Sequence, residues 1–169
     1  MILNRQEILE RILKEKLIQG YTDAKSQLQP AGFDLTVEKV FKLKTQGAID
    51  FDNKGRKISE VTELAWGADG WLELKQGTYK IQFAEEVALP GELAAMTILR
   101  SSVMRCGCVM HQGYWDPGYH GKGETALYVG NENGLRLKKG AKIAQMVFFK
   151  VAGGGADEIY AGMHQHENV

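Results

Sequence analysis

The sequence lacks the features of a membrane-spanning or disulfide-stabilised protein. Only two of its 169 residues are cysteine, and no stretch approaches the roughly 18 consecutive apolar residues of a membrane-spanning helix. Cys106 and Cys108 are one residue apart, too close for an ordinary disulfide, so we expect reduced thiols. The opening segment, MILNRQEILERI, carries charges where a signal peptide needs an apolar run. Together these absences predict an intracellular, cytoplasmic protein.

The sequence also lacks an excess of charge of either sign. Its 21 Lys and Arg residues balance its 21 Asp and Glu residues, which leaves a formal net charge of zero. A general nucleic-acid-binding protein or a membrane-surface protein needs surplus positive charge, so we expect neither nucleic acid nor a membrane as a partner. Any polyanion that binds must be small and must meet a local cluster of cations.

Several chemical motifs are missing as well. There is no G-x-x-x-x-G-K-[ST] phosphate loop and no G-x-G-x-x-G turn opening a helix, so P-loop and dinucleotide-binding folds are not expected. Zinc-type base deamination lacks its H-x-E and P-C-x-x-C ligand set. Cys106, Cys108 and His111 could meet a zinc ion but have no clear fourth ligand, and a zinc-stabilised protein of unrelated function is one alternative.

The residues that are present indicate a single domain over residues 1–169. With 44% hydrophobic residues, this length is enough to bury a core. The capping-box pattern of Asn4 and Glu7 predicts one N-terminal helix over about residues 4–19. Its apolar stripe, which we expect to face the core, consists of Ile8, Leu9, Ile12 and Leu13. The polar tail, about residues 153–169, is expected to be mobile.

After the helix the pattern changes to short alternating strands. Residues 71–74 and 79–83 flank a turn at 75–78 and predict a hairpin. Residues 44–70 are polar and irregular, which predicts a long surface excursion. The fold class is therefore mainly β, a sandwich or barrel of mostly antiparallel strands. Further strands are expected over residues 33–37, 40–43, 87–89, 93–99, 125–129 and 143–151.

Three segments are candidates for chemistry, and the first and third contain phosphate-binding residue types. Arg100, Ser101 and Ser102, with Arg105 a turn away, can grip phosphate oxygens through guanidinium and hydroxyl groups. An ordinary helix start with a serine cap explains the same residues. Gln145 enters an otherwise apolar strand, where its amide must be paired either within the core or with a ligand.

The second segment is a glycine-rich turn at residues 113–121. The Asp116-Pro117-Gly118 sequence forces a tight turn and fixes the orientation of the Asp116 carboxylate. Trp115 and Tyr119 are spaced to flank a planar ligand. A plain hairpin whose aspartate bonds its own backbone is the alternative interpretation.

Taken in order, these segments resemble the trimeric dUTPase and dCTP deaminase superfamily. The resemblance covers roughly residues 27–166 and implies a distorted, jelly-roll-like β-barrel. The matching motifs are residues 29–35 (QPAGFDL), 89–90 (LP) with 93–95 (LAA) and 100–107 (RSSVMRCG), 115–121 (WDPGYHG), and 140–148 (GAKIAQMVF).

The superfamily contains two chemistries, which differ at single residues. Its deaminases carry a glutamate five residues beyond the glycine that matches Gly121, and this position is Ala126 here. A register shift of one or two residues gives Leu127 or Tyr128, and Glu124 lies two positions too early. Because removal of a ring amine needs a positioned proton shuttle, the resemblance favours a dUTPase.

The resemblance to the dUTPases implies roles for individual residues. Asp116 would orient and deprotonate a water that attacks the α-phosphorus of dUTP, giving dUMP and pyrophosphate. Tyr119 would pack against the deoxyribose, and the backbone between His111 and Trp115 would read the uracil. Mg²⁺ would be held mainly through the substrate phosphates, with Asp34 as a candidate ligand. Phosphate contacts are implied for Arg100, Ser101, Ser102 and Gln145, with Arg105 beside them.

The resemblance also implies a homotrimer with sites between subunits. The chain lacks the glycine-rich C-terminal arm of the dUTPases, which leaves the tail around Tyr160 as the segment available to close the site. Besides the zinc-stabilised protein, three alternatives to a dUTP diphosphatase stay open: a dCTP deaminase, a bifunctional enzyme that performs both steps, and a non-enzymatic nucleotide-binding β-module.

Overall fold

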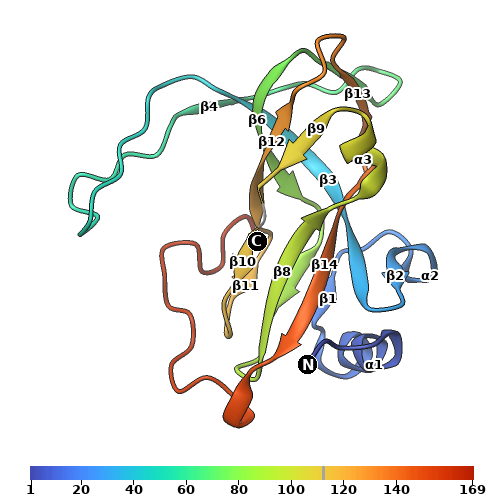
Figure 1. Ribbon diagram of the computed structural model, residues 1–169, viewed down its shortest axis with the longest axis vertical. Helices are drawn as coiled ribbons and strands as arrows, with labels where there is room; N and C mark the ends of the chain where they lie inside the picture. The colour runs from blue at the N-terminus through green and yellow to red at the C-terminus, as the bar shows by residue number, and fades with distance from the viewer. Residues whose placement is uncertain (112) are drawn as a thin grey trace.

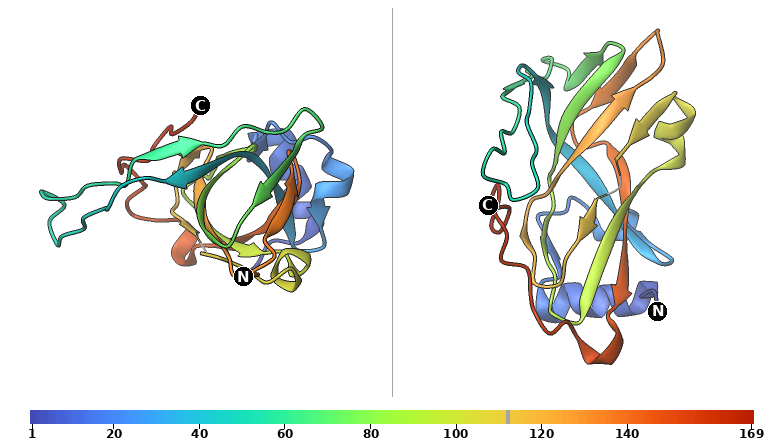
Figure 2. Two further views of the ribbon diagram at one scale, coloured as in Figure 1. Left: turned by 90° about the horizontal axis from the view of Figure 1, so that it is seen from above. Right: turned by 60° about the vertical axis from the view of Figure 1, so that its left-hand side comes forward.

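The computed structural model describes residues 1–111 and 113–169. Its strands curl into a barrel-like body, and a short N-terminal helix packs at one end (Figure 1; Figure 2). This arrangement confirms the predicted fold class. In chain order the elements are α1 (Arg5–Glu15), β1 (Ile18–Gln19), α2 (Ala24–Gln27), β2 (Leu28–Gln29), β3 (Gly32–Leu43), β4 (Val61–Glu63), β5 (Trp71–Leu74), β6 (Gly77–Phe83), β7 (Glu86–Ala88), β8 (Leu93–Leu99), α3 (Ser101–Arg105), β9 (Cys108–Met110), β10 (Tyr114–Trp115), β11 (His120–Gly121), β12 (Glu124–Val129), β13 (Leu135–Lys138), β14 (Lys142–Lys150) and a 3-10 turn at Ala152–Gly154.

One antiparallel sheet forms most of the body. Its strand order is β10-β8-β14-β3-β6-β12-β9, and β2 and β4 add to the ends of β3. The long strand β3 merges the two strands predicted over residues 33–37 and 40–43. Smaller sheets, β1-β7-β11 and β13-β5, complete the fold. The side chains of β3 from Phe33 to Val37 are all buried, which places β3 through the centre of the core.

The N-terminal helix begins as predicted and ends earlier. The Asn4 side chain accepts a hydrogen bond from the Glu7 N–H, and the Glu7 carboxylate accepts one from the Asn4 N–H, so the capping box is present. The helix stops at Glu15 because Lys16 adopts a left-handed conformation, with φ 57°. Ile18–Gln19 then pair with β7 as a strand.

The apolar stripe of α1 is buried on only one side. Ile8 and Ile12 are buried and Leu9 packs partly against the core, but Leu13 is 71% exposed. Because the helix lies at the end of the barrel, the core covers less of the stripe than predicted. None of the helices in residues 1–111 and 113–169 is long and apolar enough to cross a membrane.

The predicted hairpin of residues 71–74 and 79–83 is wrong. Strand β5 pairs with β13, whereas β6 pairs with β3 along one edge and with β12 along the other. A strand has only two edges, so these two partners leave no edge of β6 for β5. The alternating pattern predicts both strands correctly, but segments distant in sequence decide their partners.

Residues 44–60 leave the body as an extended arm between β3 and β4 (Figure 1; Figure 2). A single antiparallel bridge between Ala48 and Lys57 joins the two sides of the arm. Ile49, Phe51 and Ile58 on this arm are exposed. The arm accounts for most of the surface excursion predicted over residues 44–70.

A buried carboxylate connects β3 to the turn before β7. Glu85 is 0% exposed, and its oxygens accept hydrogen bonds from the Thr36 N–H at 2.8 Å and the Thr36 hydroxyl at 2.7 Å. The Gln27 amide also donates to Glu85 at 2.7 Å, and the same amide donates to the Asp34 carbonyl at 2.9 Å. Burial raises the pKa of the Glu85 carboxyl above its ordinary value, although these hydrogen bonds act in the opposite direction.

We expect the Glu85→Gln substitution to remove a pH-dependent part of the stability. Because the folded-state pKa is raised from 4.5, the folded chain holds this proton more tightly than the unfolded chain. The resulting contribution is fully present below pH 4.5 and is lost as the pH rises through the folded-state pKa. Thermal unfolding should therefore show the wild-type midpoint falling relative to the variant as the pH rises above 4.5. A difference that is constant with pH would contradict this.

Candidate active site

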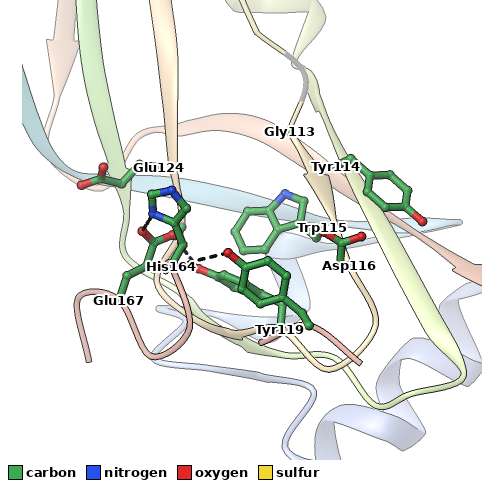
Figure 3. Close-up of a pocket in the computed structure, with 10 residues that line it drawn as sticks. Gly113, Tyr114, Trp115, Asp116, Tyr119, Glu124, His164 and Glu167 are labelled. Carbon is green, nitrogen blue, oxygen red and sulfur yellow. Dashed lines mark hydrogen bonds and ion pairs between the residues drawn. The ribbon is translucent and has the colours of Figure 1, made fainter. Parts of the chain in front are cut away.

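A tight turn presents Asp116 to a pocket at the side of the barrel. The Tyr119 N–H donates to the Asp116 carbonyl at 3.1 Å and closes the turn. Gly118 within it has φ 84°, a left-handed conformation that suits glycine. The Asp116 side chain is exposed and lines the pocket (Figure 3). The described residues provide no hydrogen-bond partner for its carboxylate, so it can orient a water molecule.

The pocket holds about 290 Å³ and is shared by residues 113–121, here called the Asp116 segment, and the C-terminal tail. Such a volume lies at the lower end of small-ligand sites. Among the residues predicted for the site, the pocket brings together Asp116, Trp115 and Tyr119. The other lining residues are Gly113, Tyr114, Gly123, Glu124, Tyr160, His164 and Glu167.

Two buried aromatic rings form the inner wall of this pocket. Trp115 and Tyr119 are each 6% exposed, and their ring centroids are 4.9 Å apart at an interplanar angle of 88°. Phe83 packs behind Trp115 with a centroid distance of 6.3 Å. Trp115 therefore supports the Tyr119 ring from the core. Both rings line the pocket, and the expectation that they flank a ligand stays a prediction.

The C-terminal tail lies along the Asp116 segment. The Tyr160 N–H donates to the Pro117 carbonyl at 2.7 Å, and the Tyr160 ring lies 5.8 Å from that of Tyr119. Further along, the His166 N–H donates to the His120 carbonyl at 2.7 Å. Tyr160, His164 and Glu167 thereby enter the pocket wall, and of these only Tyr160 was singled out from the sequence. The other two become visible only once the tail is seen beside the Asp116 segment, which is distant in sequence.

The predicted phosphate-binding residues form a second cluster, where β8 leads into α3. Arg100 follows β8 and lies 3.4 Å through Nε from an oxygen of Asp34. Ser101 and Ser102 are exposed in the first turn of α3, and Arg105 is exposed at its end. Gln145 lies on β14, between Ile98 and Asp34 in the strand register.

The cluster also includes Lys142, a cation that lies within the 140–148 motif but has no role implied by the resemblance. Lys142 Nζ lies 3.6 Å from the Asp34 carboxylate and donates to the Ser26 carbonyl at 2.9 Å. Its position at the start of an apolar strand was the available signal. Asp34 is 2% exposed, and burial raises the pKa of its carboxyl while Arg100 and Lys142 lower it. The buried Asp34 carboxylate thus holds two cations near the start of β3.

This setting does not suit Asp34 as a direct metal ligand. Its Oδ2 already faces Arg100, Lys142 and the Gln29 amide. Within residues 1–111 and 113–169, no group of three or more His, Cys, Asp and Glu side chains is placed to hold a metal ion. Cys106 is exposed and Cys108 is buried, and both are free thiols.

Within one chain, the two clusters lie at opposite ends of β8. Trp115 pairs with Ala95, and Arg100 follows five residues after Ala95. At about 3.3 Å per residue, roughly 16 Å of strand separates the two positions. None of the predicted phosphate-binding residues lines the pocket. A single subunit therefore does not assemble all the predicted site residues around one cavity.

The backbone between His111 and Trp115, expected to read the base, makes some of its hydrogen bonds within the fold. The Gly113 N–H donates to the Thr97 hydroxyl, and the Gly113 carbonyl accepts from the Thr97 N–H, each at 3.1 Å. The His111 N–H donates to the Ala126 carbonyl, and the exposed His111 side chain does not line the pocket. Residue 112, inside this stretch, lies outside the described residues.

The position at which the deaminases carry glutamate has no acid in the structure. Ala126 lies on β12 opposite Lys80 and does not reach the Asp116 pocket. Glu124 does line this pocket, but its two oxygens accept hydrogen bonds from the Lys80 ammonium at 2.7 and 2.9 Å. Its carboxylate is thus committed to an ion pair at the pocket edge.

Comparison with known proteins places the chain among nucleotide-processing proteins. A family model described as dCTP deaminase-like matches residues 2–151. A Methanosarcina mazei protein named probable deoxyuridine 5′-triphosphate nucleotidohydrolase is 38% identical, with 100% of this chain and 99% of that protein covered. A Methanococcoides burtonii protein of the same name is 37% identical, with 99% of each chain covered.

A solved structure resembles the fold. The crystal structure of 2′-deoxycytidine 5′-triphosphate deaminase from Agrobacterium tumefaciens matches with a TM-score of 0.68 and 18% sequence identity. The match covers 87% of this chain but 47% of that one, so this chain spans about half of its length. At this identity, the likeness concerns the barrel alone.

The packing of Trp115 generates a prediction about the pocket wall. A Cβ atom at Gly123 would collide with the Trp115 ring, two of whose atoms lie 2.8 Å from its position. We expect Gly123→Ala to displace the ring, shift tryptophan fluorescence and reduce the free energy of unfolding by roughly 1–3 kcal/mol. Gly91→Ala is the matched control, because its nearest contact would be an ordinary 3.6 Å. Equal stability of the two variants would refute this packing.

Proposed function

The chain belongs to the dCTP deaminase-like family, and we propose that it is a dUTP diphosphatase, producing dUMP and pyrophosphate. The observation that carries the proposal is the Asp116 carboxylate, exposed at a fixed turn beside the Tyr119 ring and without a protein hydrogen-bond partner among the described residues. The archaeal relatives named probable deoxyuridine 5′-triphosphate nucleotidohydrolase, similar over the full chain, support the same substrate.

Asp116 acts as the general base. Its carboxylate accepts a proton from a water molecule, whose oxygen attacks the α-phosphorus of dUTP. The bond from this phosphorus to the bridging oxygen breaks, and pyrophosphate leaves with the electron pair. Because the turn holds the carboxylate in place, the side chain needs little reorientation to reach the reactive geometry.

The Tyr119 ring forms the floor for the deoxyribose, where a 2′-hydroxyl would collide with it. Tyr114 is the residue whose backbone faces away from β8, because Gly113 and Trp115 on either side pair with that strand. Its backbone donor and acceptor are therefore available to read the edge of uracil, with His111 near the same stretch. Cytosine would leave such fixed groups unpaired, which favours uracil.

Arg100 and Lys142 bind the triphosphate, since both are cations held near the start of β3 by the buried Asp34. The serine hydroxyls and the Gln145 amide complete the phosphate contacts, and Arg105 adds charge from the end of α3. We assign Mg²⁺ to the substrate phosphates rather than to Asp34, whose oxygen already faces two cations. The ion would neutralise charge on the phosphate oxygens.

Two subunits are required for a complete site in this proposal. Asp116 and Tyr119 of one chain would meet Arg100, Ser102 and Gln145 of another, because β8 separates the two clusters within a chain. A closed ring of three copies repeats this contact three times, so we propose a homotrimer. The tail around Tyr160, docked beside Asp116, is the segment available to cover the bound nucleotide.

Deamination of dCTP is the competing activity, because Glu124 shares the pocket with Asp116. Its bidentate pairing with Lys80 disfavours it as a proton shuttle, since both oxygens are occupied. The two activities differ in their products.

We expect the purified protein with Mg²⁺ to release pyrophosphate from dUTP far faster than from dCTP, dTTP or UTP, and to release no ammonia from dCTP. Pyrophosphate and ammonia are assayed together over this panel. Ammonia from dCTP would show a deaminase or a bifunctional enzyme. Tight binding of dUTP without any pyrophosphate would show a nucleotide-binding module instead.

Asp116→Asn serves as the matched variant in the same assay. It keeps the shape of the side chain but cannot accept the proton, so kcat should fall roughly 10²- to 10⁴-fold with KM little changed. Full activity of this variant would place the base elsewhere.

Mixing experiments test the shared site. Inactive Asp116→Asn and inactive Arg100→Ala proteins, unfolded and refolded together, should recover part of the wild-type activity, because some mixed sites carry neither change. Light scattering on the wild-type protein should give the mass of three 18.8 kDa chains. A monomeric mass, or no recovery on mixing, would contradict the trimer.

A further inference from the structure

Hydrogen bonds to residues 118–122 fix the tail in one register. Besides the bond from His166 to the His120 carbonyl, the Lys122 N–H donates to the Glu167 carbonyl at 3.0 Å. The Gln165 side chain uses both ends of its amide: it accepts from the His120 N–H at 3.0 Å and donates to the Gly118 carbonyl at 2.9 Å. These bonds place residue 167 beside Gly121 with little freedom to slide.

Gly121 allows the tail to come this close. A Cβ atom at this position would lie 3.0 Å and 3.1 Å from the Glu167 carbonyl oxygen and amide nitrogen. It would also lie 2.9 Å from the Tyr119 hydroxyl oxygen. The missing side chain thus provides the space in which Glu167 and Tyr119 meet.

The Glu167 carboxylate anchors the end of the Tyr119 side chain. The Tyr119 hydroxyl donates to Oε1 of Glu167 at 2.9 Å, and Oε2 faces Nδ1 of His164 at 3.0 Å (Figure 3). Burial, assisted by the Glu167 charge, raises the pKa of the Tyr119 hydroxyl, which keeps it protonated as the donor. Within the described residues, this is the only hydrogen bond of that hydroxyl.

We propose that Glu167 is a positioning residue that holds the Tyr119 ring as a fixed floor for the sugar and thereby sets the discrimination between deoxyribonucleotides and ribonucleotides. This inference rests on the proposed dUTP diphosphatase activity. Trp115 and Tyr160 pack against the ring, with centroid distances of 4.9 Å and 5.8 Å, and the Glu167 carboxylate holds its hydroxyl end. Without the carboxylate the ring can move aside, and a 2′-hydroxyl gains the space that the fixed ring denies it.

The test compares kcat/KM for dUTP and UTP across a set of variants. Glu167→Ala should lower the preference for dUTP over UTP by roughly tenfold or more, because a hydrogen bond to a charged group is lost. Glu167→Gln keeps an acceptor oxygen and should retain most of the preference. Glu158→Gln is the matched control, since Glu158 is exposed on the same tail, and it should behave like the wild type.

A double-mutant cycle separates positioning from general damage. Tyr119→Phe removes the same hydrogen bond from the other side and should lower the preference by a similar factor. The combination of Tyr119→Phe with Glu167→Ala should lower it no further, because both changes remove one interaction. An unchanged preference in Glu167→Ala, additive losses in the double variant, or an equal loss in Glu158→Gln would each overturn the inference.

A spectroscopic measurement keeps the inference distinct from the proposed activity. In protein labelled with 3-fluorotyrosine, the ¹⁹F signal that disappears in Tyr119→Phe reports the position of this ring among the six tyrosines. It should shift in Glu167→Ala but not in Glu158→Gln. No hydrolysis of dUTP by the wild type, together with this shift, would refute the proposed function while supporting the anchoring role. No shift would refute the anchoring role itself.

Discussion

The register of β8 between its two neighbours determines how the candidate site is divided. One edge fixes Gln145 opposite Ile98, and the other fixes Trp115 opposite Ala95. A slip of one residue would turn every buried side chain of the strand toward solvent, so this register is strongly specified. The distance between Asp116 and Arg100 is therefore a property of the barrel, and no loop movement within one subunit removes it.

Two buried carboxylates organise the cationic end of the barrel. Glu85 holds Gln27 and Thr36, Gln27 holds the backbone of Asp34, and the Asp34 side chain holds the cations. Each link depends on the previous one, because a buried carboxylate is tolerated only when its oxygens are hydrogen-bonded or paired. The groups proposed to bind phosphate thus derive their positions from a polar network that extends into the core.

Local sequence patterns predicted most of the helices and strands, but they did not predict which distant strands pair. The apolar run of residues 93–99 predicted β8 with its observed bounds, and the capping box of Asn4 predicted the start of α1, since both depend on neighbouring residues. The partner of β5 and the early end of α1 at Lys16 depend on where other strands pass. In the site, the motifs predicted Asp116 and Tyr119, whereas the anchoring of Tyr119 by Glu167 joins residues 48 positions apart and has no local signature.

Two glycines of the Asp116 segment constrain two parts of the chain at once. A Cβ atom at Gly118 would lie 2.6 Å from Cβ of Ile159, and one at Gly121 would press on the backbone of Glu167. A mutation that introduces a side chain at either position therefore evicts the tail as well as straining the turn. The Asp116 segment and the tail are therefore expected to change together during evolution. A protein without the tail would need these glycines only for the backbone conformation of the turn, whereas a protein with the tail needs them for its close approach as well.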